Sequence, residues 1–322
     1  CDTYGEMYHG QRQFIGGCQW HPFDHQRGYH PDTYYGGIYD AFRQKKYAFE
    51  MFRSQDRNAE PMVFIANEMT QFSDNDVTVF SNCDSVRLTM FEGDKVMTLP
   101  VVHNDNDKPC APVVFKDFWN FWAAREYSYK QRNWQRVSLL AEGIKDGKVV
   151  AVQKKMPSRR STKLRLYADD MGRKLNADGS DFIVVVAEVT DDNGNVKRLA
   201  KDNIYFTVEG EGRIIGDGEN IMANPRIVEW GSAPVLIQAT DKPGKITIKA
   251  RSYYDGVHAP AAAELTIESV APTLPACYTD KPTATVSKPV RTTGETKQTM
   301  TDEERQRTLE EVNKQQAEFG VQ

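Results

Sequence analysis

Polar and aromatic side chains that could bind a polar ligand are concentrated in one short stretch of the sequence. Within ten residues the chain holds three of its six histidines. Carboxylate, guanidinium and phenol groups follow closely, so that the set comprises His21, Asp24, His25, Arg27, Tyr29, His30, Asp32, Tyr34 and Tyr35. These groups both donate and accept hydrogen bonds, and Trp20 just before them offers a flat apolar face. The mixture is typical of a binding site for a polar ligand.

Two predicted elements must position this stretch. The apolar run Phe14–Trp20, which contains two adjacent glycines, predicts a buried strand approached closely by another group. Residues 36–55 mix apolar and basic positions at helical spacing, which predicts a closing helix. A strand that ends in a loop of polar and aromatic side chains is how a barrel presents a site at the C-terminal ends of its strands. We therefore expect a strand, a loop and a helix.

A family resemblance is carried by Trp20, Phe23-Asp24, Arg27-Gly28-Tyr29, Gly36-Gly37-Ile38, Asp40, Phe42-Arg43 and Arg53-Ser54-Gln55. This pattern resembles the end of the catalytic barrel of glycoside hydrolase family 2, in its bacterial β-galactosidase-like branch. There the last barrel strand carries a tryptophan that lines the sugar subsite, and a Gly-x-x-Asp-x-x-Arg segment, here Gly37 to Arg43, leads into the final helix. The family usually has Pro before the lysine of that helix, whereas this chain has Gln44-Lys45-Lys46.

The resemblance implies a substrate-binding role for this stretch. Trp20 would stack on a sugar ring, and His21, Asp24, His25 and Arg27 would bind sugar hydroxyls or orient the catalytic pair. The alternatives are a core tryptophan at Trp20 and a satisfied polar network at the barrel mouth. A metal site formed by His21, Asp24, His25 and His30 matches no known ligand spacing, so we expect neither a metal nor a cofactor.

No catalytic residue is expected in this chain. A retaining glycosidase uses two carboxylates about 5–5.5 Å apart. In the family these are glutamates, one after an Asn and one in a Ser-Glu-aromatic-Gly run, and neither motif stands in this sequence. Glu6 is the only imitation, and the thirteen residues between it and Trp20 barely allow a parallel crossover. We expect the isolated chain to be inactive, with the N-terminal barrel of the same protein missing.

Composition narrows the class of partner. The 322 residues include 41 Lys and Arg against 45 Asp and Glu, a net charge of -4, which gives no reason to expect a nucleic-acid partner. The sequence contains no apolar stretch of the roughly 18 residues that a membrane span needs, so none is expected.

The cysteines exclude the usual zinc spacings and a dense disulfide scaffold, because the five are scattered and form no CxxC pair. A Cys83–Cys110 bridge in an oxidising compartment stays open. Cys1 could be the lipidated first residue of a bacterial lipoprotein, or the chain could be a truncated piece of a longer protein.

The rest of the chain predicts a mainly β fold. Short alternating segments separated by Gly and Asp turns indicate two immunoglobulin-like β-sandwiches, preceded by the last strand and helix of a (β/α)8 barrel. The expected domains are the barrel end at 1–57, the first sandwich at 58–153, a basic linker at 154–163, the second sandwich at 164–270, and a polar tail with a short helix at 271–322. A strand and helix without their partners cannot close a barrel, so we expect residues 1–55 to be mobile or to pack on the first sandwich.

A second aromatic cluster contains Trp119, Trp122 and Trp134. It could form a carbohydrate-binding platform, or it could belong to the sandwich core or to an interface with the barrel.

Together these observations predict the C-terminal part of a retaining, β-galactosidase-like β-glycosidase. It would be secreted or periplasmic and would act on a carbohydrate. The alternative is a non-catalytic carbohydrate-binding or adhesion protein built of β-sandwich modules.

Overall fold

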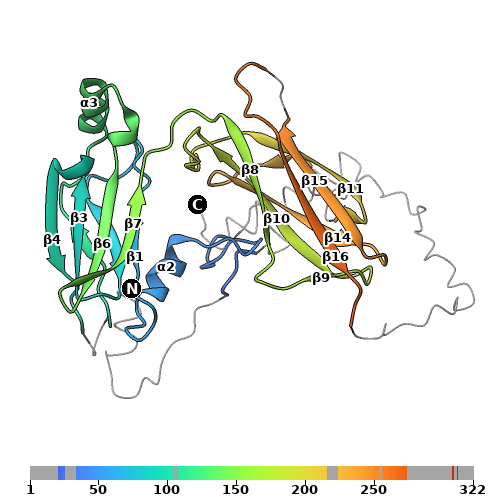
Figure 1. Ribbon diagram of the computed structural model, residues 1–322, viewed down its shortest axis with the longest axis horizontal. Coiled ribbons are helices and arrows are strands. Elements are labelled where there is room, and N and C mark those ends of the chain that lie inside the picture. Colours follow the sequence, from blue (N-terminus) through green and yellow to red (C-terminus); the bar gives the residue numbers. More distant parts are fainter. Residues whose placement is uncertain are drawn as a thin grey trace, which may run out of the picture. The chain divides into compact units, whose positions relative to one another are not determined.

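The computed structural model describes residues 21–25, 34–104, 108–215, 224–253 and 256–273, together with Arg307 and Glu310. Residues 1–272 form one compact unit and residues 273–322 a second. The first unit is mainly β and contains two pairs of sheets (Figure 1). In the second unit, Arg307 and Glu310 are helical; the rest of the predicted tail helix lies outside the described residues, as does the predicted strand Phe14–Trp20.

The first sheet pair contains seven antiparallel strands. One sheet has the order β1-β2-β5 and the other the order β4-β3-β6-β7. The strands are β1 (Val63–Ala66), β2 (Val77–Ser81), β3 (Ser85–Met90), β4 (Lys95–Pro100), β5 (Val113–Phe115), β6 (Leu139–Lys145) and β7 (Lys148–Lys155). Alternate residues of β2 and β3 are buried, as the period-2 pattern predicts for strands with one face on a core.

One hydrophobic core joins these two sheets. Ile65 and Val79 from one sheet and Leu88 from the other have no exposed surface. Trp119, which follows β5, lies in the same core. The core therefore fixes the sheets against each other and takes up one of the three tryptophans of the predicted aromatic cluster.

Helix α3 (Phe121–Gln131) lies between β5 and β6 in the sequence and at one end of the first sheet pair (Figure 1). It begins after Asn120, whose side-chain oxygen accepts a hydrogen bond from the Ala123 N–H at 3.0 Å. It ends at Arg132, whose left-handed backbone has a φ of 51°. Single 3-10 turns lie at Phe91–Gly93 and Trp134–Arg136.

The second sheet pair contains nine strands in the orders β12-β14-β10-β8 and β13-β11-β15-β16-β9. The strands are β8 (Lys163–Asp169), β9 (Leu175–Asn176), β10 (Phe182–Thr190), β11 (Asn203–Gly210), β12 (Gly212–Ile215), β13 (Arg226–Ile227), β14 (Ser232–Ala239), β15 (Gly244–Ser252) and β16 (Ala263–Val270). All pairs are antiparallel except β16 with β9. Val185, Phe206 and Ile248 belong to its own core.

The connection between the two sheet pairs is shorter than the predicted linker. Strand β7 continues to Lys155 and β8 begins at Lys163, so basic residues at both ends of 154–163 are in strands. Residues 191–195 form a turn, as the Asn-Gly sequence at 193–194 predicts. Asp191 accepts hydrogen bonds from the backbone N–H groups of Asn193 and Asn195, both at 2.9 Å.

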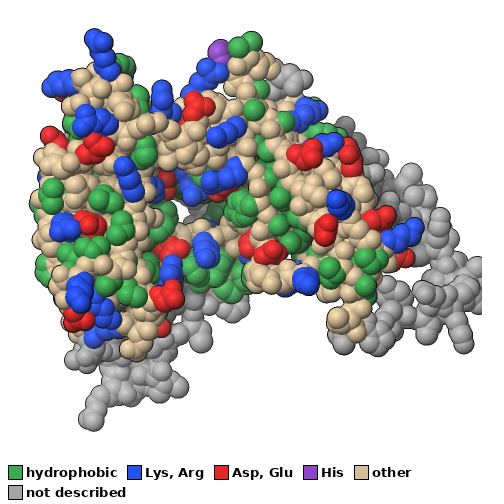
Figure 2. Space-filling view, in the orientation of Figure 1, with side chains coloured by type: hydrophobic (Ala, Val, Ile, Leu, Met, Phe, Trp, Pro, Cys, Tyr) green, Lys and Arg blue, Asp and Glu red, His purple; other side chains and the backbone are tan. Residues whose placement is uncertain are grey.

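The cysteines, the surface charges and the helices can each be compared with the sequence. Cys83 and Cys110 are both buried free thiols, so the structure contains no bridge between them. Lys, Arg, Asp and Glu side chains are interspersed over the visible face rather than gathered by sign (Figure 2). No helix in the described part of the chain has the length and apolar character to cross a membrane.

Candidate functional site

Residues 21–25 and 34–46 fold against each other by single backbone bridges. Phe23 pairs with Tyr39 in parallel, and His25 pairs with Tyr34 antiparallel. Gly37 makes the crossing feasible, because a Cβ there would lie 2.4 Å from the Asp24 backbone nitrogen. Only glycine avoids this overlap. Gly37, the glycine of the Gly-x-x-Asp-x-x-Arg segment, is therefore required for this packing.

Asp24 is the buried centre of this arrangement, with 4% of its surface exposed. Its Oδ1 accepts a hydrogen bond from the Gly37 N–H at 2.9 Å and from the Lys46 ammonium group at 2.6 Å. Lys46 also donates to the Tyr35 carbonyl at 3.1 Å. The carboxylate is therefore neutralised within its own segment, and its contacts position the chain around it.

The rings of His21, His25 and Tyr34 form a cluster in the same segment. The two imidazole centroids lie 4.2 Å apart, edge to face, and the Tyr34 ring lies 5.1 Å from His21 and 5.7 Å from His25. His21 has a left-handed backbone with a φ of 49°, which is uncommon for a residue with a Cβ. Both ring nitrogens of His21 and the Nδ1 of His25 are buried, whereas Tyr34 is 42% exposed. Tyr34 is therefore the member of the cluster that a polyhydroxylated ligand would meet first, and its phenol can donate or accept hydrogen bonds.

Asp40 organises the loop that leads out of the cluster. Its Oδ1 accepts hydrogen bonds from the backbone N–H groups of Phe42 and Gln44, both at 2.8 Å. Burial raises the pKa of this carboxyl above its ordinary value, against the opposing effect of those two hydrogen bonds. Arg43 places its guanidinium 5.1 Å from the Phe23 ring centroid.

The predicted closing helix over residues 36–55 is wrong in its extent. The structure has a helix only at α2 (Tyr47–Arg53), and residues 36–46 form a loop. The physical reason is that Gly37 and Asp40 direct local backbone contacts that compete with helical hydrogen bonds. A helical periodicity in the side chains did not reveal this competition.

The end of this segment packs on the first sheet pair. The Tyr47 ring centroid lies 5.2 Å from that of Phe64 in β1. Gln55 exchanges two hydrogen bonds with the backbone of Cys110, at 2.8 and 3.1 Å. Residues 47–55 thus pack on the first sheet pair as expected, whereas Phe42 and Gln44 contact Arg226 and Tyr167 of the second sheet pair, which was not expected.

Of the five predicted site residues, the structure brings together His21, Asp24 and His25. Trp20 and Arg27 lie outside the described residues, and so does Glu6. Lys46, which lies 22 residues from its partner Asp24, was not among the predicted site residues. No local spacing links the two, so only the Gly37 crossing could have indicated their proximity. The described residues contain no cluster of three or more metal-ligating side chains.

The predicted aromatic cluster divides in two. Trp119 is 1% exposed and belongs to the core, whereas Trp122 on α3 is 64% exposed. Trp134 is partly buried against the core. The three tryptophans therefore do not form one platform.

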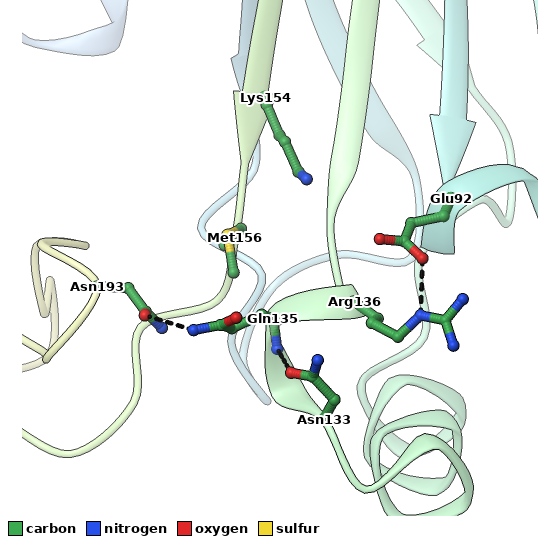
Figure 3. Close-up of a pocket in the computed structure, with 7 residues that line it drawn as sticks. All are labelled: Glu92, Asn133, Gln135, Arg136, Lys154, Met156 and Asn193. Atoms are coloured by element: carbon green, nitrogen blue, oxygen red, sulfur yellow. Dashed lines mark hydrogen bonds and ion pairs between the residues drawn. The ribbon is translucent and has the colours of Figure 1, made fainter.

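A polar pocket of about 350 Å³ lies beside the 3-10 turn Trp134–Arg136 (Figure 3). Its groups largely satisfy one another. Arg136 and Glu92 form an ion pair at 2.7 Å, and Gln135 donates to the Asn193 side-chain oxygen at 3.1 Å. Lys154 points toward the space between them (Figure 3). None of the described residues that line this pocket is aromatic, which makes it a poor match for a sugar ring.

The sequence is similar to a family model and to known glycosidases. The family model "Glycoside hydrolase family 2 C-terminal domain 5" matches residues 164–255, which lie in the second sheet pair. A β-galactosidase of Thermoanaerobacter pseudethanolicus is 32% identical over 261 residues, covering 77% of this chain and 33% of that protein. A β-glucuronidase of Formosa agariphila is 27% identical, over 67% of this chain and 20% of that protein.

Solved structures share the fold. A β-glucuronidase from glycoside hydrolase family 2 matches with a TM-score of 0.55 at 23% identity, over 76% of this chain and 24% of that one. A β-glycosidase from Bacteroides vulgatus matches with a TM-score of 0.54 at 20% identity, over 72% of this chain and 28% of that one. The chain spans about a third or less of the length of these relatives.

Proposed function

This chain belongs to glycoside hydrolase family 2, of which it is a C-terminal portion, and we propose that it completes the substrate site of a β-galactosidase-like enzyme. The proposal gives the segment around His21, Asp24 and His25 the role of one wall of a sugar subsite. The observation that carries it is the buried Asp24–Lys46 pair in the same segment as the ring cluster of His21, His25 and Tyr34.

The contacts of each residue in this wall indicate its role. Asp24 is a positioning residue, because both of its hydrogen bonds go to its own segment. Tyr34, the exposed member of the cluster, would meet the sugar first, and His21 and His25 behind it would bind sugar hydroxyls through the ring nitrogens that the sugar can reach. Trp20 and Arg27 would extend the wall, with Trp20 stacking on the ring as the family resemblance implies.

Hydrolysis itself would come from outside this sequence. We infer a double displacement by two glutamates, one acting as acid/base and one as nucleophile. Neither family motif for these glutamates stands among the 322 residues. We also infer that each sheet pair is an immunoglobulin-like sandwich that supports the barrel end, and that the protein is secreted or periplasmic.

The test compares two proteins on three substrates. Aryl β-galactoside, β-glucuronide and β-mannoside would be offered to the 322-residue chain and to the product of the complete reading frame that encodes it. We expect hydrolysis only by the complete product, with the galactoside preferred. Hydrolysis by the 322-residue chain would overturn the inference that the glutamates lie elsewhere. Inactivity of both proteins would favour the non-catalytic carbohydrate-binding protein.

A further inference from the structure

A groove of about 360 Å³ lies between the loop that joins β1 to β2 and the hairpin that joins β13 to β14. We call it the aromatic groove. Its wall includes the aromatic residues Tyr47, Phe72 and Trp230 and the carboxylates of Glu68, Asp74 and Asp76. Small-ligand sites commonly have this size and combine apolar walls with a few polar groups.

Trp230 occupies the tip of a two-residue hairpin turn. Glu229 and Ser232 exchange backbone hydrogen bonds at 2.9 and 3.0 Å, and Trp230 and Gly231 between them have φ values of 49° and 79°. Such turns favour Asn, Asp and Gly, because both central residues are left-handed. Trp230 takes this unfavourable backbone and still leaves its side chain exposed, with the whole residue 68% exposed. An outlier without compensating burial points to a role outside folding.

The opposite wall is a loop held rigidly by its own hydrogen bonds. The Thr70 N–H donates to the Ser73 hydroxyl at 2.9 Å, and the Ser73 N–H donates to the Thr70 carbonyl at 3.1 Å. The Asn67 amide also donates to the Asp74 carbonyl at 3.0 Å. This loop presents Phe72, which is 75% exposed. Two exposed aromatic rings thus stand on preorganised turns, which lowers the entropic cost of binding a ligand between them.

The carboxylates that line the groove disfavour anionic ligands. None of the described residues that line it is Lys, Arg or His. Two of its carboxylates already have cationic partners from outside the lining, since Glu68 lies 3.1 Å from Lys155 and Asp76 lies 2.6 Å from Lys116. An anionic ligand would meet carboxylates and no cation in the lining, whereas hydroxyl groups could donate to the carboxylate oxygens.

We propose that the aromatic groove binds a neutral oligosaccharide, as a second sugar-binding surface in addition to the wall around His21 and His25. The pyranose rings would stack on Trp230 and Phe72, and their hydroxyls would donate to Asp74 and accept from Thr70 and Ser73. A sugar bound here would hold a longer glycan on the protein. The proposal goes beyond hydrolysis and does not depend on it.

The test is calorimetric titration of the 322-residue chain with β-1,4-galactotetraose, and with tetragalacturonate as an anionic comparator of the same length. Trp230→Asn removes the ring but suits the left-handed turn, so it should bind at least tenfold more weakly without a lower melting temperature. Phe72→Ser should weaken binding in the same direction. Trp122→Ala is the matched control, because that tryptophan is 64% exposed on α3 and does not line the groove.

The proposal is supported if the neutral sugar binds, the anionic one does not, and only the two groove variants lose affinity. It is overturned if the neutral sugar gives no binding heat, if tetragalacturonate binds as well, or if Trp230→Asn binds like the parent. A lower melting temperature of Trp230→Asn would also overturn it, since the groove would then be a packing surface. Because no hydrolysis is measured, these failures would leave the proposed enzymatic role standing.

Discussion

The carboxylate of Asp24 and the ammonium group of Lys46 lie 2.6 Å apart, with the Asp24 side chain 2% exposed and that of Lys46 30% exposed. The pair joins the loop after residue 20 to the residue that precedes helix α2. Since a buried carboxylate without a partner is costly, the pair holds the two segments in one arrangement.

Lys46→Met should therefore open the segment locally. Because Lys46 keeps some contact with solvent, we place the loss at the low end of the range for broken buried pairs, about 3 kcal/mol. The amide of Gly37, which donates to Asp24, reports this opening by hydrogen exchange. Lys45→Met is the matched control, since Lys45 lies over the Phe49 ring and should cost about 1 kcal/mol or less. Equal effects of the two substitutions would refute the role of the pair.

Gly37→Ala should disrupt the same segment from the backbone side. The new Cβ would lie 2.4 Å from the Asp24 nitrogen, so the crossing strands must separate at a cost of about 1–3 kcal/mol. Gly147→Asn is the control, because Gly147 has a φ of 72° with no atom within 4 Å of the position that a Cβ would take, and Asn tolerates that backbone. Exchange rates across residues 34–46 would rise only in the first variant; unchanged rates there would contradict the packing argument.

The two neighbouring tryptophans should respond in opposite ways to truncation. Trp119→Ala removes a fully packed core side chain and should cost about 3–5 kcal/mol in the free energy of unfolding. Trp122→Ala removes an exposed ring and should stay within about 0.5 kcal/mol. Urea denaturation measures both. Similar losses would mean that α3 packs differently from the structure.

Tyr167 provides a pH-dependent test. Burial raises its pKa to about 12 from 10.0, and its hydroxyl donates to the Gln44 side chain at 3.0 Å. The folded state keeps this proton after the unfolded state has lost it, so stability is fully present below pH 10 and is lost between about pH 10 and 12. The difference in urea midpoint between the wild type and Tyr167→Phe should shrink across that window. A constant difference would argue against a buried phenol.

The strands were largely predictable because their burial follows local alternation. The apolar runs at 181–189 and 245–250 predict strands, and β10 and β15 lie within two residues of those bounds. Helix α3 was not predicted, because Trp122 was assigned to an aromatic cluster and the only start signal is the single capping residue Asn120. The helix predicted over 36–55 was too long, because the side-chain period gives no sign of the hydrogen bonds that the backbone of Phe42 and Gln44 donates to Asp40.

The candidate site was predictable in composition but not in geometry. His21, Asp24 and His25 stand close together in the sequence, so their proximity in space required no long-range information. The burial of Asp24 depends on Lys46, and the aromatic groove depends on Trp230 meeting a loop near residue 72. Contacts across such separations follow from tertiary packing, which a single sequence does not display.

In the proposed role, the chain supplies a sugar-binding wall to a β-glycosidase. We would measure kcat/KM for an aryl β-galactoside on the product of the complete reading frame carrying Trp20→Ala or His25→Ala, with Trp122→Ala as control. We predict that each site variant loses at least tenfold, about 1.4 kcal/mol of transition-state stabilisation, while the control keeps the wild-type value. Site variants as active as the control would contradict the claim.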